Sequence, residues 1–218
     1  MNKVWLVYLL LSAYIFTSAH QKEIEDVNPY RFENMDDVIQ CGKYRLRIKF
    51  GKKDGSARFK LFEKTVAGKL QKLQSVKAIR ETDIPEIDDS EDLNNDGFRD
   101  IKIKWANAGR GANELDKLFI FDPMQKKLID IVNSQEYPNL QYNETRNCIN
   151  AFVFSGGSTT YFLNLKGKKL EEFGRVDYYN DTVRSYRIGK NDTILIKQIP
   201  YDGEEDGAVF FDDFDPIK

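Results

Sequence analysis

Hydrophobic and polar residues alternate along several segments of the chain. Between positions 43 and 50, Tyr44, Leu46, Ile48 and Phe50 occupy every second position, with Lys or Arg between them. Successive side chains of a β-strand point to opposite faces, so this period predicts a strand with one buried and one solvated face. The same signal recurs at residues 59–62, 101–105, 118–121, 152–154, 161–165 and 194–196.

Three of these segments are followed by the same sequence pattern: a short turn, then basic residues and a Leu that opens another strand. The three Leu residues are Leu70, Leu128 and Leu170. The interval from Leu128 to Leu170 is close to the length of one propeller blade. We therefore expect an all-β protein, an antiparallel meander that is β-propeller-like, with an ordinary series of hairpins as the alternative. Helical spacing is weak, and residues 33–40 are the best candidate for a short helix.

The amino-terminal residues have the pattern of a secretory signal. Lys3 precedes an apolar run from Val4 to Phe16, and Thr17-Ser18-Ala19 provides a small-residue cleavage site. The alternative is a membrane anchor, but the run is shorter than the roughly 20 residues that cross a bilayer. We expect residues 1–19 to be a signal peptide, 20–40 a linker or edge segment and 41–218 a single β domain. The mature protein would be periplasmic or secreted, with no membrane span.

Charge and histidine content exclude several kinds of binding site and catalytic site. The chain has 33 basic and 35 acidic residues, for a formal net charge of −2, which gives no support for binding nucleic acid through phosphate neutralisation. His20 is the only histidine and lies at the cleavage point. A mature domain without histidine has no Ser-His-Asp or Cys-His machinery and no His-containing zinc site. The chemistry that remains for the mature domain is catalysis by carboxylates or binding of a hard cation.

Cys41 and Cys148 are the only cysteines. An oxidising exported environment allows a disulfide between them. The alternative is that both are buried thiols that pack as small apolar residues. The sequence leaves the two alternatives open, because nothing in it places the two side chains together.

The segment from residue 92 to residue 100 carries the strongest chemical signal. It matches the first nine positions of an EF-hand-type calcium loop, with Gly97 at the sharp turn. Position 12 of the loop, where a bidentate Glu is expected, is Ile103, so water or an upstream acid (Asp88, Asp89 or Glu91) would replace it. The expected metal ligands are Asp92, Asn94, Asp96, Phe98 through its carbonyl, and Asp100.

The flanks of this loop are not those of a helix-loop-helix. Pro85 interrupts the upstream side, and residues 101–105 alternate as a strand. The pattern therefore predicts an EF-hand-like calcium loop that enters a strand, with Ca²⁺ as a structural ion of modest affinity, about 10⁻⁴ to 10⁻³ M. The alternative is a solvated turn rich in Asp, Asn and Gly. Magnesium fits less well, because its octahedral sites usually keep several waters and fewer carboxylates.

Residues 92–128 resemble a known family. The segment Asp92 to Asp100, the alternating strand after it, and Leu118-Phe119-Ile120-Phe121-Asp122-Pro123 with Leu128 are similar to bacterial periplasmic calcium-binding immunity proteins. Those proteins inhibit peptidoglycan-hydrolase, lysozyme-like effectors of type IV secretion. The resemblance implies a β-propeller-like fold, a structural calcium ion on the five residues named above, and a cell-wall hydrolase as protein partner. No residue can be assigned to inhibition from it.

Two other functions stay open at this level. The first is a secreted, adhesin-like or glycan-binding propeller module without catalytic activity. The second is a carboxylate-based hydrolase, since the 35 acidic residues offer many pairs whose separation the sequence does not give. No local motif supports such a pair, so we expect a protein that is not an enzyme.

Overall fold

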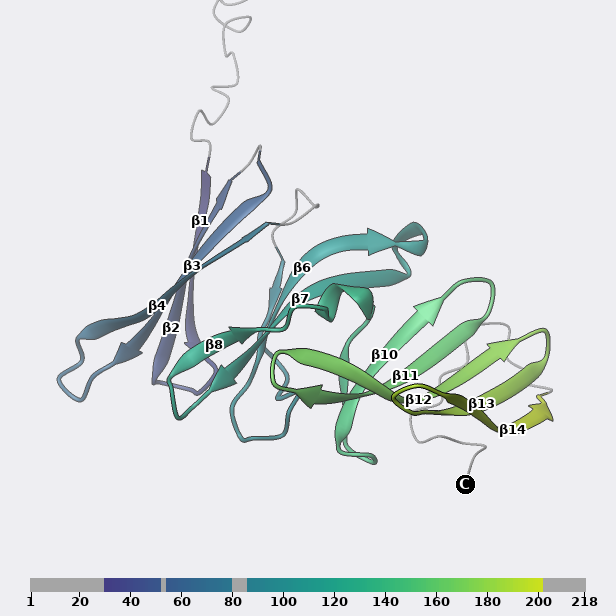
Figure 1. The fold of residues 1–218 in the computed structure, drawn as a ribbon. Coiled ribbons are helices and arrows are strands. Elements are labelled where there is room, and N and C mark those ends of the chain that lie inside the picture. The colour runs from purple at the N-terminus through teal and green to yellow at the C-terminus, as the bar shows by residue number, and fades with distance from the viewer. Residues whose placement is uncertain (1–29, 52–53, 80–85, 202–218) are drawn as a thin grey trace, which may run out of the picture.

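The computed structural model describes residues 30–51, 54–79 and 86–201. They form three antiparallel sheets in chain order, which we call sheets A, B and C (Figure 1). Sheet A contains β1 (Tyr30–Val38), β2 (Tyr44–Gly51), β3 (Ser56–Lys64) and β4 (Leu70–Ile79). Sheet B contains β5 (Ile87–Asp88), β6 (Ile101–Ala108), β7 (Asn113–Asp122) and β8 (Lys127–Asp130). Sheet C contains β9 (Gln141–Asn143), β10 (Cys148–Phe154), β11 (Ser158–Lys166), β12 (Lys169–Tyr179), β13 (Thr182–Ile188) and β14 (Thr193–Pro200).

The predicted strands and hairpins are confirmed. Each segment with a strand-like pattern lies in β2, β3, β6, β7, β10, β11 or β14, and the three hairpins are β3–β4, β7–β8 and β11–β12. The predicted helix at residues 33–40 is wrong, because β1 occupies that segment. Its residues pair in register with β2, Met35 opposite Leu46, and the ladder of hydrogen bonds outweighs a weak local preference.

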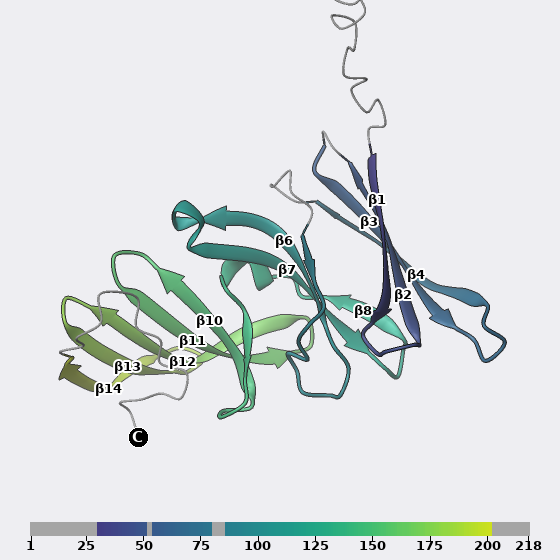
Figure 2. The same cartoon turned by 180° about the vertical axis from the view of Figure 1, so that it is seen from behind.

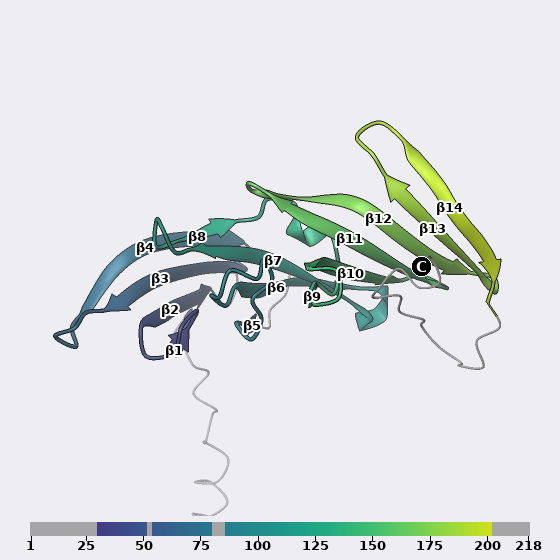
Figure 3. The same cartoon turned by 90° about the horizontal axis from the view of Figure 1, so that it is seen from below.

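Sheet B is the middle layer of a row of three sheets, as views from the front, back and below show (Figures 1, 2 and 3). Along β7, Phe119 and Phe121 belong to the apolar cluster shared with sheet A. Leu118 and Ile120 belong to the cluster shared with sheet C. Residues 118–121, grouped above with the alternating segments, are in fact all apolar, because a strand buried on both faces has no solvated side.

The described residues form no closed propeller, so the β-propeller-like expectation is not met beyond its antiparallel sheets. Sheets A and B have four strands each, but sheet C continues to six, because β13 and β14 extend it beyond β12. The three sheets follow one another in an open row (Figure 3). A propeller closes with typically four or more four-stranded blades around a central channel.

Side-chain amides join neighbouring sheets by imitating strand pairing. Gln74 of β4 donates from Nε2 to the Leu128 carbonyl of β8 (3.0 Å) and accepts the Leu128 N–H at Oε1 (2.7 Å). Asn113 of β7 makes the same pair of bonds with Phe154 of β10, at 2.9 and 2.8 Å. Asn133, after β8, repeats this pairing with Leu170 of β12. Such amides satisfy backbone groups that a further strand would otherwise pair.

Candidate functional site: an acidic loop where three sheets meet

The loop between β5 and β6, residues 89–100, is held by apolar residues on both sides of sheet B. Leu93 is buried in the cluster between sheets B and C. Phe98 packs against the cluster between sheets A and B, with its ring 5.6 Å from that of Phe121. The two anchors fix the ends of the polar segment between them, residues 94–97.

Polar contacts also tie the loop to all three sheets. The Arg99 N–H donates to the carbonyl of Ile39, in the turn after β1 (3.0 Å). The Asn95 side chain donates to Asn147, in the turn before β10 (3.1 Å). Asp100 accepts the Phe121 N–H of β7 (3.0 Å). The loop is therefore a junction at which sheets A, B and C are joined.

Within the loop, the side chains of Asp92 and Asp96 hold the backbone in a tight turn. Asp92 accepts the N–H groups of Asp96 (3.1 Å) and Gly97 (2.7 Å), and Asp96 accepts that of Phe98 (2.9 Å). Asn95 and Gly97 have φ of 56° and 89°, the left-handed region that Gly and Asn adopt most readily. The sequence order Asp-x-Asn-x-Asp-Gly thus folds as the compact turn that its residues predict.

Asn94 leaves one buried acceptor without a partner. Its Nδ2 donates to Asp96 Oδ2 (2.9 Å), whereas its Oδ1 is buried and accepts no hydrogen bond. A buried polar atom without a partner costs about 1–3 kcal/mol. A carboxylate has about four lone-pair sites, so Asp92, which accepts two hydrogen bonds, retains acceptor capacity. The loop therefore contains a buried oxygen without a hydrogen-bond partner, next to carboxylates that can accept further bonds.

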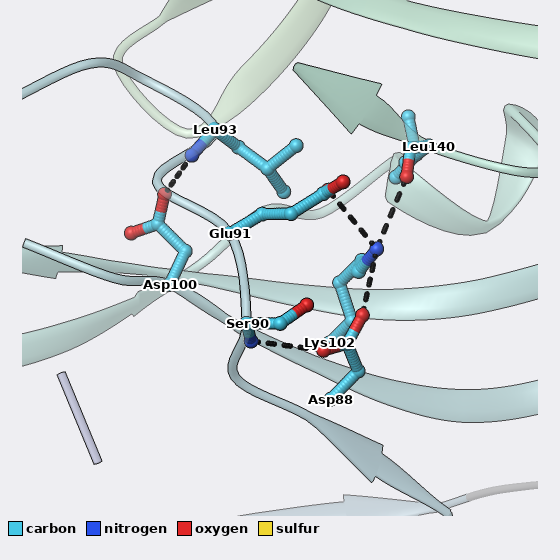
Figure 4. A network of polar contacts seen from close by, with 7 residues as sticks. All are labelled: Asp88, Ser90, Glu91, Leu93, Asp100, Lys102 and Leu140. Carbon is cyan, nitrogen blue, oxygen red and sulfur yellow. Dashed lines mark hydrogen bonds and ion pairs between the residues drawn. The ribbon is translucent and has the colours of Figure 1, made fainter. Parts of the chain in front are cut away.

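Asp100 lies at the base of the loop, and only 2% of it is exposed. One of its oxygens accepts the backbone N–H of Leu93 (2.9 Å; Figure 4). The other accepts the N–H of Phe121 (3.0 Å). Burial raises the pKa of Asp100 to about 7; the two hydrogen bonds oppose this shift, and the charges of Asp96 and Asp92 add to it. A positive charge in the loop would favour the ionised form of this carboxyl.

The upstream acids, suggested above as replacement ligands, pair with cations in the structure. Lys102 of β6 contacts Asp88 (2.9 Å), Glu91 (3.2 Å) and the Leu140 carbonyl (3.2 Å) (Figure 4). Burial would lower the pKa of Lys102, but the hydrogen bonds and charges of Asp88 and Glu91 outweigh it and raise that pKa. Asp89 lies 3.6 Å from Arg99. Sequence reasoning missed this network; the available signal was a Lys in the predicted strand that follows an acid-rich segment.

Within the described ranges, no three side chains of His, Cys, Asp or Glu are grouped so that they could hold a metal ion by themselves. The donor set of the loop is nevertheless one of hard oxygens, which is the chemistry that calcium prefers. The orphaned Asn94 oxygen and the spare lone pairs of Asp92 and Asp96 fit such an ion.

The two cysteines are free thiols in different sheets. Cys41 is exposed in the turn between β1 and β2 of sheet A, whereas Cys148 is buried in β10 of sheet C. Burial raises the pKa of the Cys148 thiol to about 11. Cys148 packs as the small buried thiol that the second alternative expected, whereas the exposed Cys41 does not.

The predicted signal peptide, residues 1–19, lies outside the described residues. None of the helical segments in the described ranges has the length and apolar character needed to traverse a bilayer.

Comparison with protein-family models and with curated proteins gives no match. Among solved structures, one similar chain is described as that of a Xanthomonas type IV secretion system related protein. It is 13% identical, with a TM-score of 0.48, and the match covers 79% of this chain and 96% of that one. A likeness at this level carries no argument about function.

Proposed function

We propose that this protein is a periplasmic or secreted calcium-binding β-protein that binds and inhibits a peptidoglycan hydrolase, in the manner of an immunity protein. The ion is structural and sits in the acidic loop. The observation that carries the calcium assignment is the buried, unpartnered Oδ1 of Asn94 beside Asp92 and Asp96. A native loop rarely leaves such an oxygen unsatisfied unless an ion or water completes it.

The residues that would hold the ion are Asp92, Asn94, Asp96, Phe98 through its carbonyl, and Asp100. Calcium takes six to eight oxygen ligands, so water would supply the remaining positions. When bound, the ion supplies two positive charges among three carboxylates. The loop contacts sheets A, B and C through Ile39, Phe121 and Asn147, so ordering it would stiffen the junction of all three.

Thermal unfolding with and without calcium tests the ion. For a Kd of about 10⁻⁴ to 10⁻³ M, free Ca²⁺ at 10 mM stabilises the folded state by about 1.4 to 2.7 kcal/mol. For a chain of this size we expect the melting temperature to rise by about 3 to 10 °C, and a chelator to reverse the rise. Asn94→Ala should abolish the response, whereas Asn164→Ala, at an exposed position of β11, should leave it intact. Melting curves that coincide in calcium and in chelator would contradict the assignment.

The inhibitory function is supported by the resemblance of residues 92–128 to the immunity family. It is tested by mixing the protein with a panel of lysozyme-like peptidoglycan hydrolases and following the clearing of a peptidoglycan suspension. We expect inhibition of at least one enzyme, with calcium improving the thermal persistence of the inhibition. If no enzyme is slowed by a molar excess of folded protein, the inhibitory function is excluded for that panel, and the calcium site is judged separately from its own melting data.

A further inference from the structure

The outward face of sheet A is strongly basic. In β2 and β3 the apolar side chains face sheet B in the shared core, so the residues that alternate with them face outward. This face, with its neighbours on β4, carries seven cations, which we call the basic face: Arg45, Arg47, Lys49, Arg58, Lys60, Lys72 and Lys77. The protein as a whole has a net charge of −2. The remainder of the molecule is therefore net acidic, so the protein has a basic region, the basic face, and an acidic region, the rest of the chain.

Like charges lie directly opposite one another on the basic face. Arg47 pairs with Lys60, Lys49 with Arg58, and Arg58 with Lys77 across the strands. Directly opposed like charges destabilise a sheet. Among the described residues, only Arg45 of the seven cations has an acidic partner within ion-pair distance, Asp36. The opposed cations of this face are thus left with little acidic compensation from the described residues, which makes the face suited to an external anion.

Aromatic rings hold some of these cations in place. The Lys49 ammonium lies 3.4 Å from the centroid of the Tyr30 ring, and the Arg47 guanidinium lies 4.9 Å from that of Phe62. Phe32 lies beside them on β1 with 59% of its surface exposed. A shallow hollow of about 360 Å³ runs between Phe32, Arg47, Lys49, Arg58, Lys60 and Phe62. The exposed Arg47 guanidinium lies over the half-buried Phe62 ring, so this charge is outermost, as binding to phosphate requires.

We propose that the basic face docks the processed protein onto an anionic phospholipid bilayer. A four-stranded sheet presents its cations as a broad array, which matches a surface of lipid phosphates. Sheet A forms one end of the row of sheets (Figure 3), so a bilayer can approach it without meeting the acidic remainder. Sheet A is also the described sheet closest in sequence to the apolar run of residues 4–16, which we expect to direct export.

Stacking of nucleic-acid bases is less favoured by the same geometry. Lys49 and Arg47 each occupy one face of the Tyr30 and Phe62 rings, and a base needs an open ring face. Partial insertion of the exposed Phe32 ring at the level of the headgroups suits a lipid surface, where aromatic side chains are enriched.

The binding to the bilayer should be electrostatic, with each cation of the basic face contributing separately to the affinity. Each Lys or Arg near an anionic surface contributes about a fivefold increase in partition coefficient, and the attraction falls with ionic strength. Replacing three of the seven cations should therefore reduce binding by roughly two orders of magnitude.

The test is flotation of the purified processed chain with phosphatidylcholine vesicles, with or without one quarter phosphatidylglycerol, in chelator so that calcium does not bridge lipid to protein. We expect binding only to the anionic vesicles, and its loss at 0.5 M salt. The variant Arg47→Gln, Arg58→Gln, Lys60→Gln should lose about 100-fold in partition coefficient. The control Lys127→Gln, Lys168→Gln, Lys169→Gln removes three exposed cations, from β8, from the turn between β11 and β12 and from β12. It should bind as the unmodified protein does.

Three outcomes would overturn the proposal: no flotation of the unmodified protein with anionic vesicles, equal losses in the two triple variants, or binding to single-stranded DNA or polyglutamate without binding to vesicles. The last would assign the face to another polyanion. Melting temperatures of both variants show whether they fold, and the salt dependence of the unmodified protein keeps the test decisive if one does not. The result is independent of hydrolase inhibition, which is measured without lipid.

Discussion

Gln74 offers a sharp test of how sheets A and B are joined. Its amide forms two hydrogen bonds with the backbone of Leu128, at 2.7 and 3.0 Å. Leu128 is only 4% exposed, and it belongs to the edge strand β8, which has no further strand beyond it. The Gln74 side chain therefore takes the place of a neighbouring strand for this one residue.

Replacing Gln74 with Leu keeps most of the volume and removes both hydrogen bonds. The N–H and C=O of Leu128 would each lose a partner in a buried setting, at about 1–3 kcal/mol per group, and partial access of water reduces the sum. We expect a loss of about 2 to 4 kcal/mol in the free energy of unfolding. For a chain of this size, that corresponds to a fall in melting temperature of roughly 5 to 15 °C.

Urea unfolding followed by tryptophan fluorescence measures this loss. Gln71→Leu is the matched control, because Gln71 lies on the same strand but is exposed, and we expect a change within about 0.5 kcal/mol. If Gln74→Leu were no less stable than Gln71→Leu, the amide would contribute nothing to the joining of the two sheets, and the account of sheet docking through amides would be refuted.

Three further outcomes follow from burial and charge. Burial raises the pKa of Asp116 to about 6 in the folded state, above its ordinary value of 3.8. The free energy of unfolding should therefore fall by roughly 3 kcal/mol as pH rises from about 4 to 6. Asp116→Asn should remove this pH dependence, which urea titrations at pH 4 and 7 measure. A thiol reagent should modify exposed Cys41 in the folded protein and reach buried Cys148 only after unfolding; equal rates would contradict this. Phe119→Ala, in the core, should lower the free energy of unfolding by about 3–5 kcal/mol. Ile196→Lys, at an exposed position of β14, should change it by less than about 0.5 kcal/mol, and thermal unfolding of the two variants measures the difference.

The sequence alone determined the fold class and the position of the candidate site. Period-two alternation located strands in all three sheets, because the two-faced geometry of a strand imposes that pattern on any segment with one buried face. The unbroken apolar run at residues 118–121 is explained by burial on both faces of β7. The segment Asp92 to Asp100 was recognisable as a candidate because the residue types expected of a calcium loop, and the glycine of a tight turn, are local in the chain.

Only the tertiary structure decided how the sheets assemble and what surrounds the loop. Sequence alternation does not state which sheet a strand joins, so the open row of sheets replaced the expected propeller, and residues 33–40 became part of β1 through pairing with β2. The partners of Lys102, the amide of Gln74 and the opposed cations of sheet A are separated in sequence from the groups they meet. Contacts between distant residues depend on how the sheets pack, which local propensity does not encode.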